Sequence, residues 1–291
     1  MDELIINVPV IGDRADQALK EATQGQVIGA PSSGVFLRTE TDRILFLSLM
    51  AWHGPLTINL SPADRQAFSV DLHDLFQIQS ASIYFPNSRI SFQFSQAERW
   101  FPPSRPDSRL ALSVRKQRFE RVAGRVRSRR DPALQLNGKL NSTASPEPAA
   151  LRAAISTSQV TRLIEALVAG LGRGPGLTPA GDDLALGFLL ALNRWGDLLC
   201  PGLVPQPFNQ ALVETACRQT TALSANLIEC TAAGQADERL VAALDGLVSG
   251  NLAEDRIVEY LLDWGHTSGA SAMVGMGLII NLGEESIVWS V

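Results

Sequence analysis

The chain has 291 residues, of which 45% are hydrophobic and 19% are charged, and its formal net charge is −5. This composition is typical of a soluble globular protein that is long enough for two domains. The negative charge argues against a general nucleic-acid-binding protein, and the lack of any run of about 18 apolar residues argues against a membrane span.

Two further features bear on where the protein works. Its three cysteines are odd in number and show no CxxC spacing, which argues against a disulfide framework and against a zinc site. The first residues, MDELIINVPVIGD, are acidic and lack the basic region of a signal peptide. We therefore expect a cytoplasmic protein.

The first hundred residues favour β-strands. Residues 44–50, ILFLSLM, are apolar enough for a buried strand, and residues 82–94, SIYFPNSRISFQF, predict two strands around a Pro-Asn-Ser turn. Between them, residues 61–72, SPADRQAFSVDL, predict a short helix capped by Ser61.

A basic helix is predicted next. The segment from Arg89 to Arg130 holds twelve basic and three acidic residues, whereas the chain from Leu151 onward holds seven basic and fifteen acidic residues. Within the basic segment, apolar residues recur at helical spacing, at Leu112, Phe119, Val122 and Val126. Either the arginine-rich face of this helix is solvated, or it docks on the acidic C-terminal region or on a partner subunit.

The rest of the sequence predicts a linker followed by helices. Residues 131–150 have the composition of a linker, and amphipathic segments that end at glycines follow. We predict an α+β protein with a β-rich N-terminal domain over residues 1–130 that ends in the basic helix. A linker over residues 131–150 then leads to an α-helical C-terminal domain over residues 151–291.

The stretch GRGPGLTPAGDD, residues 172–183, predicts a helix start with unusual chemistry. Thr178 followed by Pro179 is typical of a hydroxyl N-cap and a proline in the first turn. Glycines before it, including Gly174 and Gly176, allow tight turns and the close approach of a ligand to the backbone. A glycine-rich loop that leads into a helix is also suited to binding an anion.

Asp182 and Asp183 fall in the first turn of this predicted helix. The helix dipole favours a carboxylate there by about 0.3–1 kcal/mol, which explains one aspartate. Adjacent helical residues point about 100° apart, so the other must face the packed interior, where it needs a partner. We therefore predict a functional site that holds Mg²⁺ or an amide or amine donor. The loop is neither a Walker A motif nor a dinucleotide-binding fingerprint.

A second helix start of similar construction is predicted in WGHTSGASAMVGMGLII, residues 264–280. Thr267 or Ser268 would cap this helix. His266 lies in the turn before it, as a structural or a catalytic residue. The small residues of the segment favour close helix packing, and the two helix starts could converge on one ligand.

A third polar stretch lies in an otherwise apolar helical segment. Thr221 and Ser224 are three residues apart and share a helix face. Their hydroxyls either bond back to carbonyls of the helix or form a polar wall of the same site.

Together these motifs resemble the AllH-like family. The resemblance is carried by GLGRGPGLTPAGDDLALGFLLAL, by Thr221 with Ser224, and by GHTSGAS at residues 265–271. This family, long a bacterial domain of unknown function, includes the AllH subunit of oxamate carbamoyltransferase. The family pattern often has an acidic residue where Ser271 stands here, which implies that part of the site differs.

The resemblance implies a role in purine and allantoin breakdown, where a carbamoyl group moves between oxalurate and phosphate to give oxamate and carbamoyl phosphate. It also implies partner subunits, an FdrA-like (AllF) protein and an AllG-type protein, and it does not say which subunit carries the chemistry. In that setting the helix starts suit phosphate or the oxamate carboxylate. The two aspartates would hold the carbamoyl NH₂ or a metal, and Arg173 would contact an oxyanion.

We therefore expect a subunit of an oxamate carbamoyltransferase-like enzyme, with catalytic candidates Asp182, Asp183 and His266. Expected substrate contacts come from both loops and from the third polar stretch: Arg173, Gly174, Gly176, Thr178, Thr221, Ser224, Thr267 and Ser268. Asp182 and Asp183 are also the candidate metal ligands. Two alternatives stay open: a non-catalytic ligand-binding or assembly subunit whose arginine-rich helix docks a partner, and a metal-dependent hydrolase of small amides or phosphates.

Overall fold

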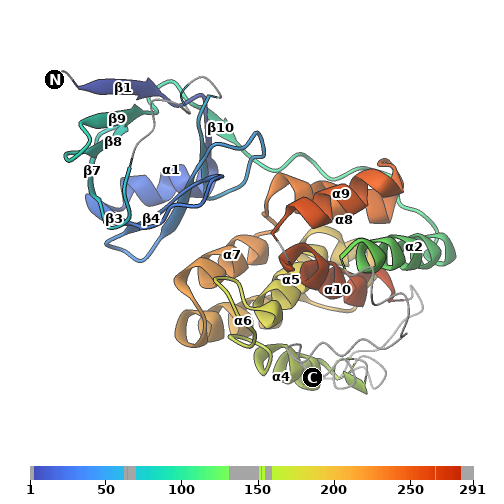
Figure 1. Ribbon diagram of the computed structural model, residues 1–291. Helices are drawn as coiled ribbons and strands as arrows, with labels where there is room; N and C mark the ends of the chain where they lie inside the picture. The colour runs from blue at the N-terminus through green and yellow to red at the C-terminus, as the bar shows by residue number, and fades with distance from the viewer. Residues whose placement is uncertain are drawn as a thin grey trace. The chain divides into compact units, whose positions relative to one another are not determined.

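The computed structural model of the chain describes residues 3–61, 64, 70–130, 151, 153–154, 159–265 and 267–282 (Figure 1). The chain divides into two compact units, Met1–Pro103 and Ser104–Val291. Strands dominate the first unit and helices form the second. The predicted α+β class, with a β-rich part before a helical part, is therefore confirmed.

The described strands of the N-terminal unit form one mixed, ten-stranded sheet. In chain order they are β1 (Leu4–Asn7), β2 (Val10–Gly12), β3 (Gln24–Gly29), β4 (Gly34–Thr39), β5 (Ile44–Ser48), β6 (Thr57–Asn59), β7 (Leu75–Gln79), β8 (Ser82–Phe85), β9 (Ile90–Gln93) and β10 (Glu98–Trp100). Their order across the sheet is β1-β9-β8-β7-β3-β4-β5-β6-β2-β10. Neighbouring strands are antiparallel except for three parallel pairs, β1–β9, β5–β6 and β2–β10.

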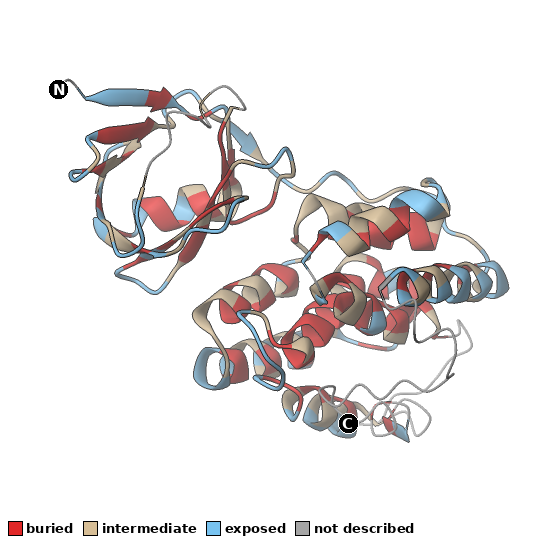
Figure 2. Ribbon diagram, viewed as in Figure 1, coloured by how far each residue is buried: buried red, intermediate tan, exposed pale blue. Residues whose placement is uncertain are grey.

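This sheet curls around one helix, α1 (Asp13–Lys20), as Figure 1 shows. The helix buries Ala15, Ala18 and Leu19, and buried residues also run along most of the strands (Figure 2). The apolar interior of this unit therefore lies within the curve of the sheet.

Two strand predictions agree with the structure. Residues 44–48 form β5, which is buried at all but one position, and residues 82–94 contain β8 and β9 as an antiparallel pair. Most of the helix predicted over residues 61–72 lies outside the described residues.

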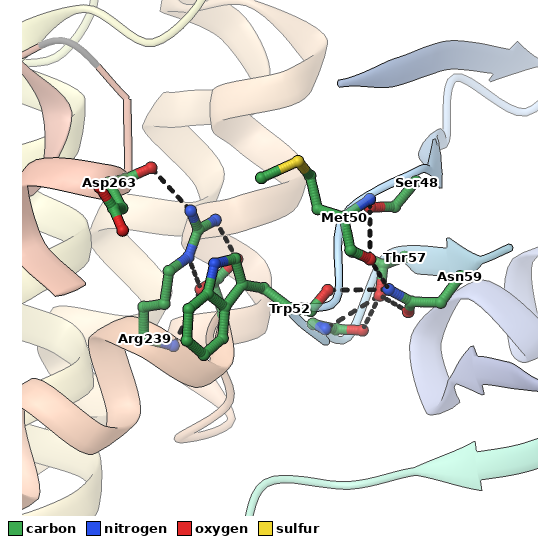
Figure 3. Close-up of polar contacts among 9 residues, drawn as sticks. Ser48, Met50, Trp52, Thr57, Asn59, Arg239 and Asp263 are labelled. Carbon is green, nitrogen blue, oxygen red and sulfur yellow. Dashed lines mark hydrogen bonds and ion pairs between the residues drawn. The ribbon is translucent and has the colours of Figure 1, made fainter. Parts of the chain in front are cut away.

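A buried asparagine holds the connection between β5 and β6. The side-chain amide of Asn59 donates to the carbonyls of Met50 at 3.1 Å and Trp52 at 2.8 Å, and its oxygen is 2.9 Å from the Thr57 hydroxyl that donates to it (Figure 3). Because these bonds satisfy carbonyls that no strand pairing reaches, one side chain fixes the path of the whole connection.

The C-terminal unit is built around one central helix. Its described helices are α2 (Leu112–Arg130), α4 (Val160–Val168), α5 (Ala180–Leu199), α6 (Pro205–Gln219), α7 (Ala222–Ala232), α8 (Glu238–Ser249), α9 (Glu254–Asp263) and α10 (Ser268–Ile280). Helix α5 is buried at every position from Gly181 to Leu192, as expected for a helix that is apolar on nearly all sides (Figure 2). None of the described helices combines the length and the hydropathy that a membrane span requires.

Helices α5 and α10 cross in backbone contact. A Cβ atom on Gly187 would overlap the carbonyl oxygen of Ala272, and a Cβ atom on Gly275 would overlap that of Leu184. Only glycine therefore fits at these two positions. The small residues of α10 serve close helix packing, as the sequence suggested.

The basic helix α2 belongs to the helical unit, which differs from the predicted domain division. Val122 and Val126 are buried in the helical core, and Phe119 packs against the same core. The apolar stripe of α2 is thus covered by helices rather than by strands, so the boundary lies at Pro103 and not near residue 130. The linker predicted over residues 131–150 lies outside the described residues.

The arginine-rich face of α2 docks on the acidic start of α9. Arg118, Arg121 and Arg125 approach Glu254 with N–O distances of 3.6, 2.7 and 3.3 Å, and Arg125 also pairs with Asp255 at 3.1 Å. The hydrogen bond from Arg121 is the main reason why the pKa of the Glu254 carboxyl lies below its usual value. Of the predicted outcomes, docking on the acidic C-terminal region is the one observed.

A buried ion pair fixes the other end of α5. Arg194 donates two hydrogen bonds of 2.7 and 2.6 Å to Asp245 of α8, and the Trp195 indole donates a third at 2.9 Å. Arg105 lies over the Trp195 ring, 5.0 Å from its centroid, and pairs with Asp197. Since an unpaired buried charge is costly, these contacts hold α5 in one position against α8.

Replacing Gly275 by alanine tests the crossing of α5 and α10. The added methyl group would overlap the backbone of Leu184, so we expect the free energy of unfolding to fall by about 1–3 kcal/mol. Urea unfolding followed by circular dichroism gives the measurement.

The matched control is Gly124→Ala in α2, where nothing lies within 4 Å of the new Cβ atom. Alanine there should be neutral or stabilising by up to about 1 kcal/mol. If the Gly275→Ala variant were as stable as this control, the described helix crossing would be incorrect.

Candidate functional site

The start of α5 is capped by backbone rather than by Thr178. The helix begins at Ala180, and Pro179 holds its N-cap position without a side-chain capping bond. The N–H of Gly181 instead donates to the carbonyl of Arg173 at 3.1 Å. The prediction that Thr178 is the cap is therefore wrong, because the loop supplies an acceptor of its own. This bond also engages the Gly181 N–H, which is one of the donors that the predicted anion site would have used.

The loop before α5 depends on glycine for its path. Gly172, Gly174 and Gly176 have φ angles of +72°, +122° and +97°, which side chains with a Cβ atom rarely adopt. Gly174 also passes close to the helix start, since a Cβ atom there would lie 2.8 Å from the backbone nitrogen of Ala180. The loop is exposed, and the side chain of Arg173 is exposed with it.

Asp182 is buried, and both of its carboxylate oxygens have partners. One oxygen accepts the backbone N–H of Gly172 at 2.7 Å, and the other accepts the hydroxyl of Thr220. The residue is 1% exposed. Asp182 therefore ties the start of the glycine loop to the end of α6, which is a structural role.

Asp183 is equally buried but unpaired. It is 1% exposed, and neither carboxyl oxygen has a hydrogen-bond partner among the described residues. Burial raises the pKa of this carboxyl to about 7; the hydroxyls of Ser268 and Thr178 oppose the rise, and the negative charge of Asp182 adds to it. Near neutral pH, Asp183 is therefore present both as a neutral acid and as a carboxylate.

Two hydroxyls lie beside Asp183 and join the two predicted helix starts. Thr178 precedes α5, Ser268 begins α10, and their side-chain oxygens form a 3.0 Å hydrogen bond. Both hydroxyls lie close enough to lower the pKa of the Asp183 carboxyl as hydrogen-bond donors, although neither forms a well-aligned hydrogen bond with it. The structure thus brings the starts of α5 and α10 together at this carboxyl.

The third polar stretch also meets the loop. Thr221 caps α7 by accepting the N–H of Ser224 at 3.1 Å, and its hydroxyl donates to the carbonyl of Leu177 at 2.6 Å. The Ser224 hydroxyl reaches the same carbonyl at 3.5 Å. These hydroxyls donate to the loop rather than back to carbonyls of α7, and they hold the glycine loop in place.

The turn before α10 is described in part. Thr267 occupies the N-cap position of α10 without a side-chain capping bond, and its carbonyl accepts the N–H and the hydroxyl of Ser271 at 3.2 and 3.4 Å. His266, the third catalytic candidate, lies outside the described residues.

Two positioning residues near the site were missed by the sequence analysis. Thr220 donates to Asp182. Arg239 pairs with Asp237 at 2.8 Å and donates to the carbonyl of Asp263 at 2.7 Å, which fixes the end of α9 shortly before α10 begins (Figure 3). No motif marks either contact, because each joins segments that are distant in sequence.

The described side chains fit a metal ion poorly. Among the residues that the structure describes, no group of three or more His, Cys, Asp or Glu side chains could hold one. Asp182 has a protein partner on each oxygen, so Asp183 is the one unengaged candidate ligand of the pair, whereas Mg²⁺ prefers several oxygen ligands. An unpaired carboxyl of raised pKa fits a ligand that both donates and accepts hydrogen bonds.

The pH dependence of stability tests the state of Asp183. Its pKa of about 7 in the folded protein exceeds the ordinary 3.8, so the native state keeps a proton that the unfolded chain releases between these values. The retained proton adds on the order of 4 kcal/mol to the free energy of unfolding below about pH 4. This contribution is lost as the pH rises through about 7. In urea unfolding, the stability of Asp183→Asn relative to wild type should therefore increase as the pH is raised from about 5 to about 8.

The neighbouring Asp182→Asn variant serves as the contrast. It replaces an accepting oxygen by an NH₂ group, so we expect a loss of about 1–3 kcal/mol across this pH range. If the two variants responded to pH in the same way, the unlike roles of the two aspartates would be refuted.

Residues 170–280 match the family model described as oxamate carbamoyltransferase subunit AllH. This segment includes the glycine loop, both aspartates, the start of α7 and the start of α10. Neither the comparison with curated proteins nor the comparison with solved structures gave a match. The resemblance seen in the sequence is therefore confirmed, and the segment that holds the candidate site is similar to the AllH family.

Proposed function

We propose that the chain is a subunit of an oxamate carbamoyltransferase-like enzyme and that it binds the small substrate at Asp183. The family that residues 170–280 match supports the role as a subunit. The observation that carries the proposal is the buried Asp183 carboxyl without a hydrogen-bond partner in the described structure. Such a group costs about 1–3 kcal/mol or more when it stays unpaired, and a substrate would complete it.

The proposed reaction needs one proton transfer that this carboxyl can perform. Phosphate attacks the carbamoyl carbon of oxalurate, the bond from that carbon to the amide nitrogen breaks, and carbamoyl phosphate and oxamate form. The leaving nitrogen takes up a proton, which neutral Asp183 donates. A pKa of about 7 populates both forms near neutral pH.

The other candidate residues take supporting parts in this proposal. The hydroxyls of Thr178 and Ser268 lie beside Asp183 and would contact the substrate, whereas Thr221 and Ser224 hold the loop. Arg173 is exposed on that loop and would meet an oxyanion. We further propose that turnover requires the FdrA-like (AllF) and AllG-type subunits, in cytoplasmic purine and allantoin breakdown.

Specific observations disfavour an assembly subunit that docks through its arginine-rich helix and a metal-dependent hydrolase. An assembly subunit that docks a partner through its arginine-rich helix would need those arginines, but Arg118, Arg121 and Arg125 pair with Glu254 of the same chain. A metal-dependent hydrolase would need more ligands than the described residues bring together.

Carbamoyl phosphate formation from oxalurate and phosphate tests the proposal, with the chain co-expressed with the AllF and AllG subunits. Asp183→Asn keeps the side-chain size but removes the acid, so we expect the rate to fall by about 10²–10⁴-fold. In the wild-type complex, the rate in this direction should fall as the pH rises above about 7, because Asp183 then loses its proton.

The matched control is Asp197→Asn, the same substitution on the same helix at a carboxylate that is 61% exposed. It should keep the wild-type rate. Equal rates for wild type and Asp183→Asn would remove Asp183 from the reaction, and a wild-type complex that forms no carbamoyl phosphate would refute the proposed function.

A further inference from the structure

We propose that Asp183 binds a primary amide group as a neutral acid, through two antiparallel hydrogen bonds. The inference rests on the proposed function, because oxamate carries such a group, and it names the part of the substrate that the site recognises. The carboxyl O–H donates to the amide oxygen, and the other carboxyl oxygen accepts an amide N–H. Both orphaned oxygens of Asp183 are then satisfied at once.

The two helix starts at Asp183 disfavour a cationic ligand. Among the described residues, Asp182 is the one charged group that shifts the pKa of Asp183, and its own oxygens are engaged by Gly172 and Thr220. Of the helices packed against α5, α10 has no ionisable residue. Helix α7 carries Glu229, two turns beyond its start, and Cys230. Helix α6 carries Glu214, Cys217 and Arg218. The starts of α5 and α10 place the positive ends of two helix dipoles at the carboxyl, and these repel a cation.

A carboxylate fits this place less well than an amide. A carboxylate can only accept, so it would leave the second oxygen of Asp183 unpaired, and it would bring another negative charge close to Asp182. A primary amide carries no charge and has a second N–H, for which the hydroxyl oxygens of Thr178 and Ser268 are nearby acceptors. The geometry therefore points to a neutral group that donates and accepts.

A ligand reaches Asp183 only when the glycine loop moves, because the residue is 1% exposed. Two side-chain hydrogen bonds hold the far end of this loop, one between the Thr178 and Ser268 hydroxyls and one from the Thr221 hydroxyl to the carbonyl of Leu177. Leu177 itself is 61% exposed. The end of the loop is thus fastened by polar contacts that an amide could replace, and not by a buried apolar side chain.

Calorimetric titration of the full chain with oxamate, between about pH 6 and about pH 9, tests the inference. Oxamate keeps the same charge across this range. Because only neutral Asp183 binds the amide, affinity should fall about tenfold per pH unit above the carboxyl pKa of about 7, and binding should take up protons from the buffer. A cation would show the opposite trend, because it needs the ionised carboxyl.

Two substitutions separate amide recognition from general loss of the site. Asparagine offers one donor and one acceptor to an amide, so Asp183→Asn should bind oxamate with an affinity that no longer depends on pH. Asp183→Leu has neither group and should bind at least tenfold more weakly at about pH 6. Asp197→Asn should keep the wild-type profile, and circular dichroism shows that each variant is folded.

The inference is overturned if oxamate affinity is constant or rises through pH 7, if oxamate does not bind at any pH, or if folded Asp183→Asn loses binding. These results are independent of the transferase assay. A complex that forms carbamoyl phosphate while oxamate binding ignores Asp183 would keep the role as a transferase subunit and overturn both the inference and substrate binding at Asp183. Oxamate binding that weakens with pH as predicted, in a complex without transferase activity, would support the inference and refute the proposed function.

Discussion

The backbone contact between α5 and α10 determines the geometry of the helical unit. Since Gly187 and Gly275 allow no side chain between the two helices, the crossing point cannot shift without separating them. A fixed crossing also fixes where both helices begin, which is why Thr178 and Ser268 come within hydrogen-bond distance. The carboxyl of Asp183 lies beside these two hydroxyls, sealed from water by packing that was set elsewhere.

Two adjacent aspartates in one helical turn have opposite tasks because they face different surroundings. Asp182 is turned toward the glycine loop and the end of α6, where a backbone N–H and a hydroxyl satisfy it. Asp183 points toward the start of α10, a helix without ionisable residues. The charge of the paired aspartate also raises the pKa of the unpaired one. The structural residue thus helps to keep its neighbour protonated.

The sequence predicted the features that depend on local pattern and missed those that depend on distant contacts. Apolar periodicity placed β5, the β8–β9 pair and the buried α5 correctly. It could not assign α2 to its unit, because an apolar stripe does not reveal whether strands or helices will cover it. It assigned Thr178 as a cap, since nothing local shows that Arg173 supplies a carbonyl or that Ser268 engages the hydroxyl. It found the aspartate pair but could not tell Asp182 from Asp183.

A protein gains no stability from a buried carboxyl without a partner, so its presence in a tightly packed unit requires a reason. Replacement by an apolar residue of similar size would remove the desolvation cost, and among the described residues it would break no hydrogen bond of the Asp183 carboxyl oxygens. The ion pair of Arg194 and Asp245, at the other end of α5, shows that this unit pairs a buried carboxylate that has only a structural role. Strained or unsatisfied groups of this kind concentrate at sites where a ligand supplies the missing partner. The orphaned oxygens of Asp183 therefore argue for a ligand more strongly than the glycine loop or either helix start does alone.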